Sequence, residues 1–239
     1  YNARLGLSFS FGRDPGSGDI AVRARPFARY GAVSAQAFLD SDNDGVFDPD
    51  ERPIEGAGFS GPRMPREVRT DANGNSFIVG LEPYRATEIG LNEATLEDPF
   101  WASSSAPVRV VTRPGSATTL LFPVIETGEV DGTVLVGRPN GGALRPGGGL
   151  KVYLRELSGA VVAETETAYD GYYFFDRIPY GHYELALDPR QLAELGYAAV
   201  PPRSVSIGAE EPFAVGQDML APPDPVVTAA GGNAEGQTD

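Results

Sequence analysis

An internal repeat constrains the fold of this chain more than any other feature of its sequence. The segment Gly31–Leu39 returns 97 residues later as Gly128–Val136. At the same offset, Thr70–Phe77 returns as Thr167–Phe174, and both copies begin with threonine, carry glycine four positions later and end with phenylalanine. Self-similarity at a fixed offset is typical of a repeated structural unit. We therefore predict two related modules rather than one large domain.

The two modules, 31–126 and 127–221, are each predicted to be a small antiparallel β-sandwich, so the fold class is all-β. The 30 glycines and 21 prolines among 239 residues are too many for a helical protein, while an apolar fraction of 41% can supply a core. Apolar and polar residues alternate with a period of two, as in Leu150–Leu154. Asn73-Gly74 and Asp170-Gly171 are typical of type I′ hairpin turns, in which both central residues have positive φ.

The two ends of the chain differ from the modules. Residues 1–12 alternate Leu and Phe with Gly, Ser and Arg, which predicts the last strand of an outer-membrane barrel; the alternative is an ordinary strand half-buried on a sandwich. Residues 13–30 are predicted to be a linker, and 222–239, rich in Pro, Gly and Ala, a disordered tail. Because the chain begins with Tyr1 instead of methionine, we expect it to be a piece of a longer protein.

Composition narrows the classes of function. The formal net charge of −14 argues against nucleic acid as a partner, because such a surface must neutralise phosphates. There is no cysteine and a single histidine, His182, which makes thiol chemistry, triad chemistry and a histidine-built metal site poor fits. By strand alternation, His182 is expected to face outward with Glu184. We therefore expect that the protein is not an enzyme.

The most specific chemical motif is the acidic segment that runs from position 40 to position 51. It matches the twelve-position calcium loop, with carboxylates at positions 1, 3, 5, 9 and 12 and glycine at position 6. The predicted Ca²⁺ ligands are the side chains of Asp40, Asp42, Asp44, Asp48 and Glu51 and the carbonyl oxygen of Val46. A strand precedes the loop and Pro53 follows it, so it is not an EF-hand. We expect a structural ion, with a solvated acidic turn as the alternative.

The second module is expected to bind no metal, because Arg138–Pro146 stands in the place of the loop and carries no carboxylate. Three other motifs receive structural interpretations. Gly56–Gly61 matches the dinucleotide-binding pattern, but Pro62 follows and no helix begins there. Trp101 and the tyrosine-rich stretch 169–183 are interpreted as a loop anchor and as core packing. Stacking of sugar rings on these aromatic residues remains an alternative.

Three short motifs follow one another between positions 70 and 96. They are Thr70-Asp71-x-x-Gly74, Gly80-Leu81-x-Pro83-Tyr84-Arg85 and Ile89-x-Leu91-Asn92-x-x-x-Leu96. This series resembles the C-terminal region of outer-membrane ushers of the chaperone–usher pathway, which directly follows the last barrel strand. Pro114-Gly115 before Thr119–Phe122 also fits the closing hairpin of that region. Val79-Gly80 departs from the usher pattern, and a calcium loop is not a general usher feature.

Two further resemblances cover the remaining parts of the modules. Phe38–Gly56 resembles the B-type β-domains of serine–aspartate-repeat adhesins, and the second module is similar to carboxypeptidase regulatory-like domains of transthyretin-like fold, notably at Gly132–Val134 and Thr167–Leu185. Of these, the usher resemblance implies domains in the periplasm of a bacterium, held at the outer membrane by an upstream barrel. It also implies that they bind chaperone–subunit complexes during assembly and export of pili or other surface fibres. The alternatives are a calcium-rigidified structural or adhesive stalk and a carbohydrate-binding module.

Overall fold

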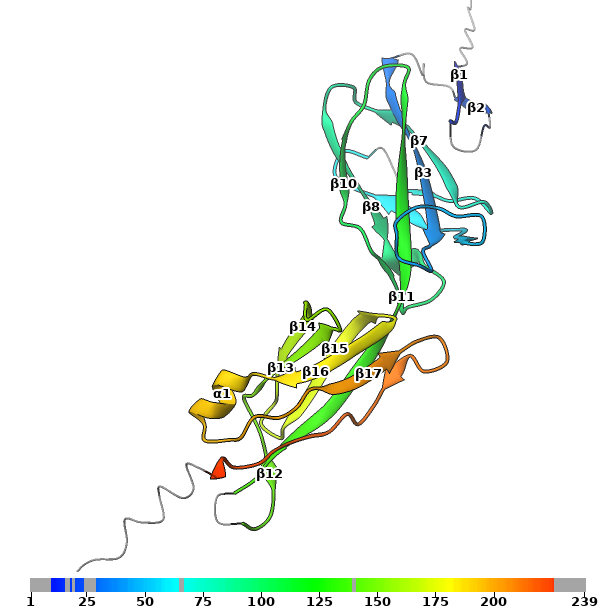
Figure 1. Cartoon of the computed structure of the whole chain (residues 1–239). Coiled ribbons are helices and arrows are strands. Elements are labelled where there is room, and N and C mark those ends of the chain that lie inside the picture. Colours follow the sequence, from blue (N-terminus) through cyan, green and yellow to red (C-terminus); the bar gives the residue numbers. More distant parts are fainter. Residues whose placement is uncertain are drawn as a thin grey trace, which may run out of the picture. The chain divides into compact units, whose positions relative to one another are not determined.

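Two compact units, 1–126 and 127–239, make up the computed structural model of this chain (Figure 1). The structure describes residues 10–15, 18, 20–23, 29–64, 67–138 and 141–225. Strands dominate both units, and the prediction of an all-β fold built from small sandwiches is confirmed. Within the described parts of the chain, no helix is both long and apolar enough to span a membrane.

Two short strands precede the first sandwich. β1 (Ser10–Arg13) pairs antiparallel with β2 (Ile20–Arg23) in a sheet of two strands. The predicted barrel strand, 1–12, lies outside the described residues except for its last three positions, which belong to β1. β2 lies within the segment 13–30, which was predicted to be a linker.

The first unit contains two sheets that enclose one core. In one sheet, β3 (Gly31–Leu39) lies between the first half of β11 (Ala117–Val136) and two strands on its other side, β4 (Arg52–Pro53) and β7 (Asn75–Leu81), while β9 (Trp101–Ser103) pairs with β11. The other sheet has the order β10 (Val108–Val111), β8 (Ala86–Asn92), β5 (Gly58–Ser60), β6 (Val68–Arg69). A 3₁₀ turn, η2 (Glu93–Thr95), follows β8.

The second unit repeats this arrangement. In one sheet, the second half of β11 has antiparallel partners on one side, β15 (Tyr172–Pro179) and β12 (Arg145–Pro146). On its other side it pairs with β18 (Phe213–Ala214) and β19 (Met219–Ala221), which run parallel to it. The other sheet has the order β14 (Val161–Glu166), β13 (Lys151–Glu156), β16 (Gly181–Leu187), β17 (Arg203–Ile207). Helix α1 (Pro189–Glu194) follows β16, in the place that η2 takes in the first unit.

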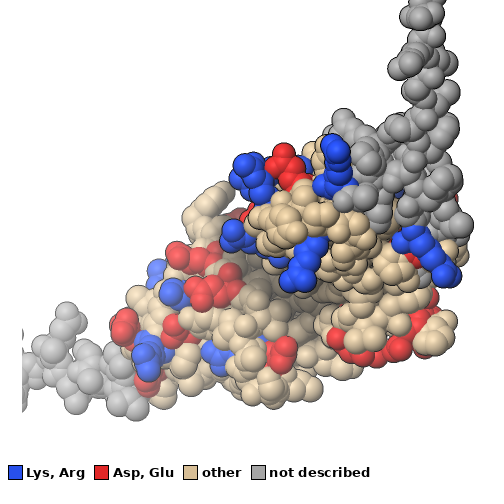
Figure 2. All heavy atoms as spheres, turned by 90° about the horizontal axis from the view of Figure 1, so that it is seen from above, with Lys and Arg blue, Asp and Glu red and all other residues tan. Residues whose placement is uncertain are grey.

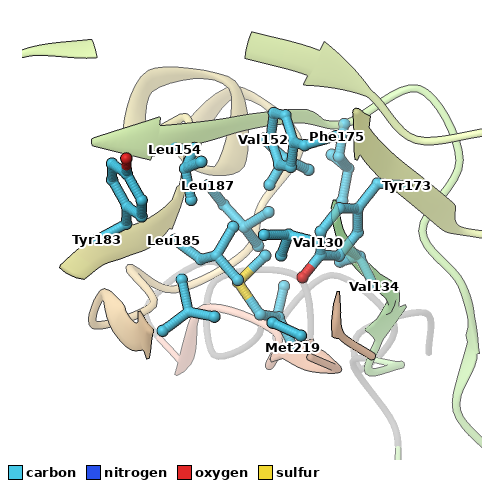
Figure 3. Packing of buried hydrophobic residues seen from close by; sticks show 14 of the residues in the cluster. Val130, Val134, Val152, Leu154, Tyr173, Phe175, Tyr183, Leu185, Leu187 and Met219 are labelled. Carbon is cyan, nitrogen blue, oxygen red and sulfur yellow. The ribbon is translucent and has the colours of Figure 1, made fainter. Parts of the chain in front are cut away.

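Each unit has its own hydrophobic core. In the first, Val33 and Ala37 of β3 pack with Ile89 of β8, and the rings of Phe59 and Phe122 lie 4.7 Å apart. In the second, valines of β11 meet leucines of β13 and β16 from the opposite sheet, with Met219 at one side (Figure 3). The two sets of buried residues have no member in common. This separation is what a repeated sandwich requires, because each copy buries its own sheet faces.

The turns at Asn73-Gly74 and Asp170-Gly171 correct the prediction of type I′ hairpins. Gly74 and Gly171 have φ of +73° and +82°, but Asn73 and Asp170 do not have positive φ. β6 and β7 belong to different sheets, so the first turn carries the chain across the sandwich. The Asp71 carboxylate accepts hydrogen bonds from the backbone N–H groups of residues 73 and 75, at 2.9 Å each. This local side-chain bonding holds the turn in another conformation.

Strand pairing differs from the expectation of purely antiparallel modules, because β11 has parallel partners in both units: β3 in the first, and β18 and β19 in the second. β3 and β11 run parallel, with Ala32 opposite Ala117 and Leu39 opposite Val124. β10 and β11 lie in different sheets, so Pro114-Gly115 does not close a hairpin between them. The first and last strands of the unit can run parallel because the whole sandwich provides the long connection that a parallel pair needs.

Candidate functional site

The acidic loop leaves the sandwich between β3 and β4. Its first residue is tied to the sheet, since the backbone N–H of Asp40 donates to the carbonyl oxygen of Val124 at 2.8 Å. The two ends of the loop, Asp40 and Glu51, are 4% and 7% exposed, while Asp42 and Asp44 are exposed. Asp40 and Glu51 are therefore drawn into the sandwich, while Asp42 and Asp44 remain open to solvent.

Three of the predicted ligands converge. Asp40, Asp42 and Asp44 each offer one carboxylate oxygen, and these oxygens all lie within 4.8 Å of one another. The backbone curls around them: the Asp40 carboxylate accepts hydrogen bonds from the N–H groups of Asp44 at 3.2 Å and Gly45 at 3.0 Å. Gly45 has a φ of +76°, a conformation that glycine adopts without steric cost. Alternate aspartates are thus directed toward one point by a sharp turn.

Glu51 has a position that sequence reasoning missed. One of its carboxylate oxygens accepts a hydrogen bond from the N–H of Ser41 at 2.9 Å, and the other from the N–H of Asp48 at 3.0 Å. Glu51 therefore fastens the beginning of the loop to its end. It does not belong to the group of three converging carboxylates. No sequence signal reveals such a clamp, because it depends on where two backbone N–H groups lie in space.

The remaining predicted ligands lie on the same loop. Partial burial raises the pKa of the Asp48 carboxyl, and the negative charges of Asp44, Asp42, Glu51 and Asp50 raise it further, in that order. Val46 exposes its side chain and donates its backbone N–H to the Asp44 carboxylate at 2.7 Å. The loop therefore concentrates negative charge that a cation would neutralise.

An aromatic contact holds this loop on the sheet. The ring of Phe47 lies 5.2 Å from that of Phe38, which is fully buried on β3. The corresponding strand in the second unit is followed by residues without a carboxylate. The acidic loop is thus an addition to one copy of a fold that both units share.

The aromatic candidates divide into buried and exposed residues. Trp101 is 6% exposed, and the guanidinium of Arg52 lies 5.1 Å from its ring centroid, so its ring has no free face for a sugar. Tyr173, Phe175 and Tyr183 belong to the core of the second unit. Only part of the cluster is available at the surface, namely Tyr169, Tyr172 and Phe174. The loop-anchor and core interpretations account for the buried members.

His182 is exposed on β16, as strand alternation predicts. Its Nδ1 lies 2.8 Å from Oγ of Ser206, which is its direct partner across the sheet on β17. The pair stands on the outer surface of an antiparallel ladder. This is the geometry of a cross-strand side-chain contact, a common stabilising element of sheets.

Thr70, the first residue of the motif series that resembles ushers, has a structural role. Oγ1 of Thr70 donates to the carbonyl oxygen of Ile54 at 2.6 Å and accepts from the N–H of Ala57 at 2.9 Å. In the second unit, Thr167 makes the same two bonds, to Gly147 at 2.6 Å and from Leu150 at 2.8 Å. The threonine of the motif is therefore an anchor of the shared sandwich fold.

We expect Thr70→Val and Thr167→Val each to destabilise the unit that contains it by about 2–4 kcal/mol, because valine leaves a buried N–H and a buried C=O without their partner. Urea unfolding of the full chain measures the loss. Thr70→Ser retains the hydroxyl and is the matched control, with a loss of about 1 kcal/mol for one buried methyl group. A valine variant as stable as the serine variant would refute the anchor.

Comparison with known proteins gives a likeness at the level of fold. No protein-family model and no curated protein sequence matches the chain. Similar solved structures include the TIE protein of Bacillus anthracis, at 16% identity and a TM-score of 0.35, over 82% of this chain and 34% of that one. The minor pilin GBS52 of Streptococcus agalactiae matches at 14% identity and a TM-score of 0.38, over 82% and 97%. The major pilin subunit BcpA of Bacillus cereus matches at 13% and 0.32, over 80% and 99%.

The chain spans about a third of the TIE protein and nearly the full length of the two pilins. The likeness to these proteins, two of which are pilins, is one of coarse β-fold and of nothing finer.

Proposed function

We propose that this chain is a structural, protein-binding segment of a bacterial surface-fibre system, with a first unit that Ca²⁺ stabilises. The observation that carries this proposal is the duplicated sandwich in which, among the residues that the structure describes, only the first copy holds a loop with three converging carboxylates. Sandwich modules recognise other proteins through their loops and strand edges, and this requires no covalent chemistry.

Calcium is the cation that suits the loop. It takes six to eight hard oxygen ligands in a flexible geometry. Asp40, Asp42 and Asp44 supply three carboxylates within reach of one point, and Asp48 adds a fourth, whose pKa is raised by desolvation first and by the neighbouring carboxylates second. The Val46 carbonyl and Glu51 complete the proposed ligand set. For Glu51 to bind the ion, it must share or release its hydrogen bonds to Ser41 and Asp48.

Calcium is expected to raise the melting temperature of the first unit by several degrees, because a ligand at 100 times its Kd stabilises the folded state by about 2.7 kcal/mol. Calorimetry of the full chain with millimolar calcium and with chelator measures the shift. Asp44→Ala should abolish it. Asp50→Ala, which removes a charge from the same loop but no proposed ligand, should keep it. Equal melting temperatures with calcium and with chelator would reject the site.

The more specific form of the proposal is the usher-like one. In it, the units lie in the periplasm, follow an outer-membrane barrel and bind chaperone–subunit complexes during fibre assembly. The motif series between positions 70 and 96 supports it. In this form a barrel would precede Tyr1, and the coding sequence upstream of that position provides a direct test. Strands of about ten residues with alternating apolar and polar side chains, in a number sufficient for a large barrel, would favour the usher. Further sandwich modules in their place would exclude it.

The second candidate is a structural or adhesive stalk. The observation that favours it is the anchor shared by Thr70 and Thr167, because a motif that both units use for folding does not single out an usher. Protease treatment of intact cells separates the candidates. Stalk modules on the cell surface would be cleaved at once, and periplasmic modules only after the outer membrane is permeabilised.

A further inference from the structure

The sandwich units present two edge strands of opposite charge. β10 is the outer strand of its four-stranded sheet in the first unit, and β14 is the outer strand of the corresponding sheet in the second (Figure 1). Among the described strands, each pairs with a single neighbour, β8 and β13 respectively. Unpaired N–H and C=O groups along such an edge form a template for another strand.

Both edges also carry exposed apolar side chains. Val111 of β10 is 56% exposed, and Val161 and Val162 of β14 are 53% and 37% exposed. Isolated surface valines are ordinary, but on an open edge they add apolar contact to backbone pairing. The edges are therefore able to bind a strand through more than their backbone groups.

Charge distinguishes the two edges. Arg109 is exposed on β10, opposite Glu88 on β8, and lines a pocket of about 390 Å³ together with Glu88, Arg63, Pro62 and Ala86. On β14 the charged side chains that are exposed are those of Glu164 and Glu166. No ion pair within the described residues involves Arg109 or Glu164. In Figure 2, acidic side chains form a band along the lower right rim, while basic and acidic side chains are interspersed over the rest of this face.

An antiparallel pairing of the two edges matches in register. With Arg109 opposite Glu164, Val111 faces Val162 on the outer side. On the inner side, Val110 then faces Ala163 and Val108 faces Thr165. The inward residues Val110 and Ala163 already contact the cores of their own units. In this register, outward-facing residues lie opposite outward-facing residues and inward-facing residues opposite inward-facing ones. Shifting the pairing by one residue would break this match.

We propose that the β10 edge of one copy of this chain pairs with the β14 edge of a second copy. Pairing of like edges would place Arg109 near Arg109 or Glu164 near Glu164, and like charges in direct opposition are unfavourable. The charges therefore suppress β10–β10 and β14–β14 contacts and permit the mixed contact. Because the two edges differ, the contact is head-to-tail and forms a ring or an open filament. Neither the calcium proposal nor the usher proposal requires such self-association.

Charge reversal tests the contact. The weight-average mass of the full chain, 25.3 kDa as a monomer, is measured by sedimentation equilibrium from about 10 μM to 1 mM, because an interface this small is expected to be weak. The wild type should increase in mass with concentration. Arg109→Glu and Glu164→Arg should each weaken association at least about tenfold. A 1:1 mixture of the two variants should restore it, since each then offers the edge that the other lacks.

Two control variants carry the same changes in net charge at other sites. Arg69→Glu changes a residue of β6, which is the other edge strand of the sheet that contains β10. Glu210→Arg changes a residue of an exposed turn in the second unit. Both should associate like the wild type, and circular dichroism checks that every variant is folded. A wild type that stays at 25.3 kDa at every concentration would overturn the proposal. So would single variants that associate normally, or a mixture that fails to recover.

Discussion

Replacing Phe59 by alanine should lower the free energy of unfolding of the first unit by about 3–5 kcal/mol, and Leu185→Ala that of the second by about 2–5 kcal/mol. Both side chains are fully buried, and they belong to separate cores. The loss combines the transfer of apolar surface to water with the cavity that remains. Each change should therefore shift one unfolding transition and leave the other in place.

The single tryptophan makes this experiment selective. Trp101 lies in the core of the first unit, so its fluorescence during urea unfolding follows that unit, while calorimetry follows both. Tyr84→Ala and Leu195→Ala are matched controls, because these side chains are 74% and 56% exposed and should cost less than about 1 kcal/mol. If Leu185→Ala lowered the tryptophan transition as much as Phe59→Ala does, the two units would not unfold independently.

The features that sequence predicts well here are those encoded by neighbouring residues. The start of α1 is encoded locally, by Asp188 and Pro189: the Asp188 carboxylate accepts hydrogen bonds from the N–H groups of Arg190 at 2.9 Å and Gln191 at 3.3 Å, and proline is favoured at the first helical position. These two bonds lower the pKa of the Asp188 carboxyl. Period-two alternation likewise predicts that His182 faces outward. In each case the physical cause lies within a few positions along the chain.

The features that sequence misses depend on which sheet a strand joins. Asn73-Gly74 and Pro114-Gly115 both mark turns, but neither reveals that the next strand crosses to the opposite sheet. The same holds for β11, which runs from Ala117 to Val136 without a break and pairs within the first unit and then the second. Turn residues report local backbone preferences, whereas partner choice is decided by packing.

The acidic loop shows the same division. The spacing of Asp40, Asp42 and Asp44 is sufficient to predict that they converge, because alternate residues in a tight turn point to one side. The clamp by Glu51 joins backbone groups at positions 41 and 48, whose proximity exists only once the loop has folded. Calcium binding itself stays a prediction that the melting experiment decides.

The repeated turn glycines give the second large effect. Gly74→Ala and Gly171→Ala should each destabilise their unit by about 3–5 kcal/mol, for two reasons. The alanine must adopt a positive φ, and its Cβ overlaps the backbone of a neighbouring strand. At Gly74 that Cβ would lie 2.4 Å from the carbonyl oxygen of Ala37, and at Gly171 2.4 Å from that of Val134. The carbonyl oxygen of Gly74 also accepts a hydrogen bond from the N–H of Ala37, at 2.9 Å. The carbonyl oxygen of Gly171 accepts one from the N–H of Val134, at 2.8 Å. A shift that relieves the overlap therefore strains a bond to the central strand.

Two other glycines separate the backbone strain from the overlap. Gly56 and Gly159 have φ of +77° and +91°, and a Cβ there would meet nothing within 4 Å. Gly56→Ala and Gly159→Ala should therefore cost only the strain of positive φ, about 1–2 kcal/mol. Urea unfolding of all four variants gives the comparison. If Gly74→Ala cost no more than Gly56→Ala, the turn could move away from β3 freely, and the contact that recurs in both units would not fix the crossing between sheets.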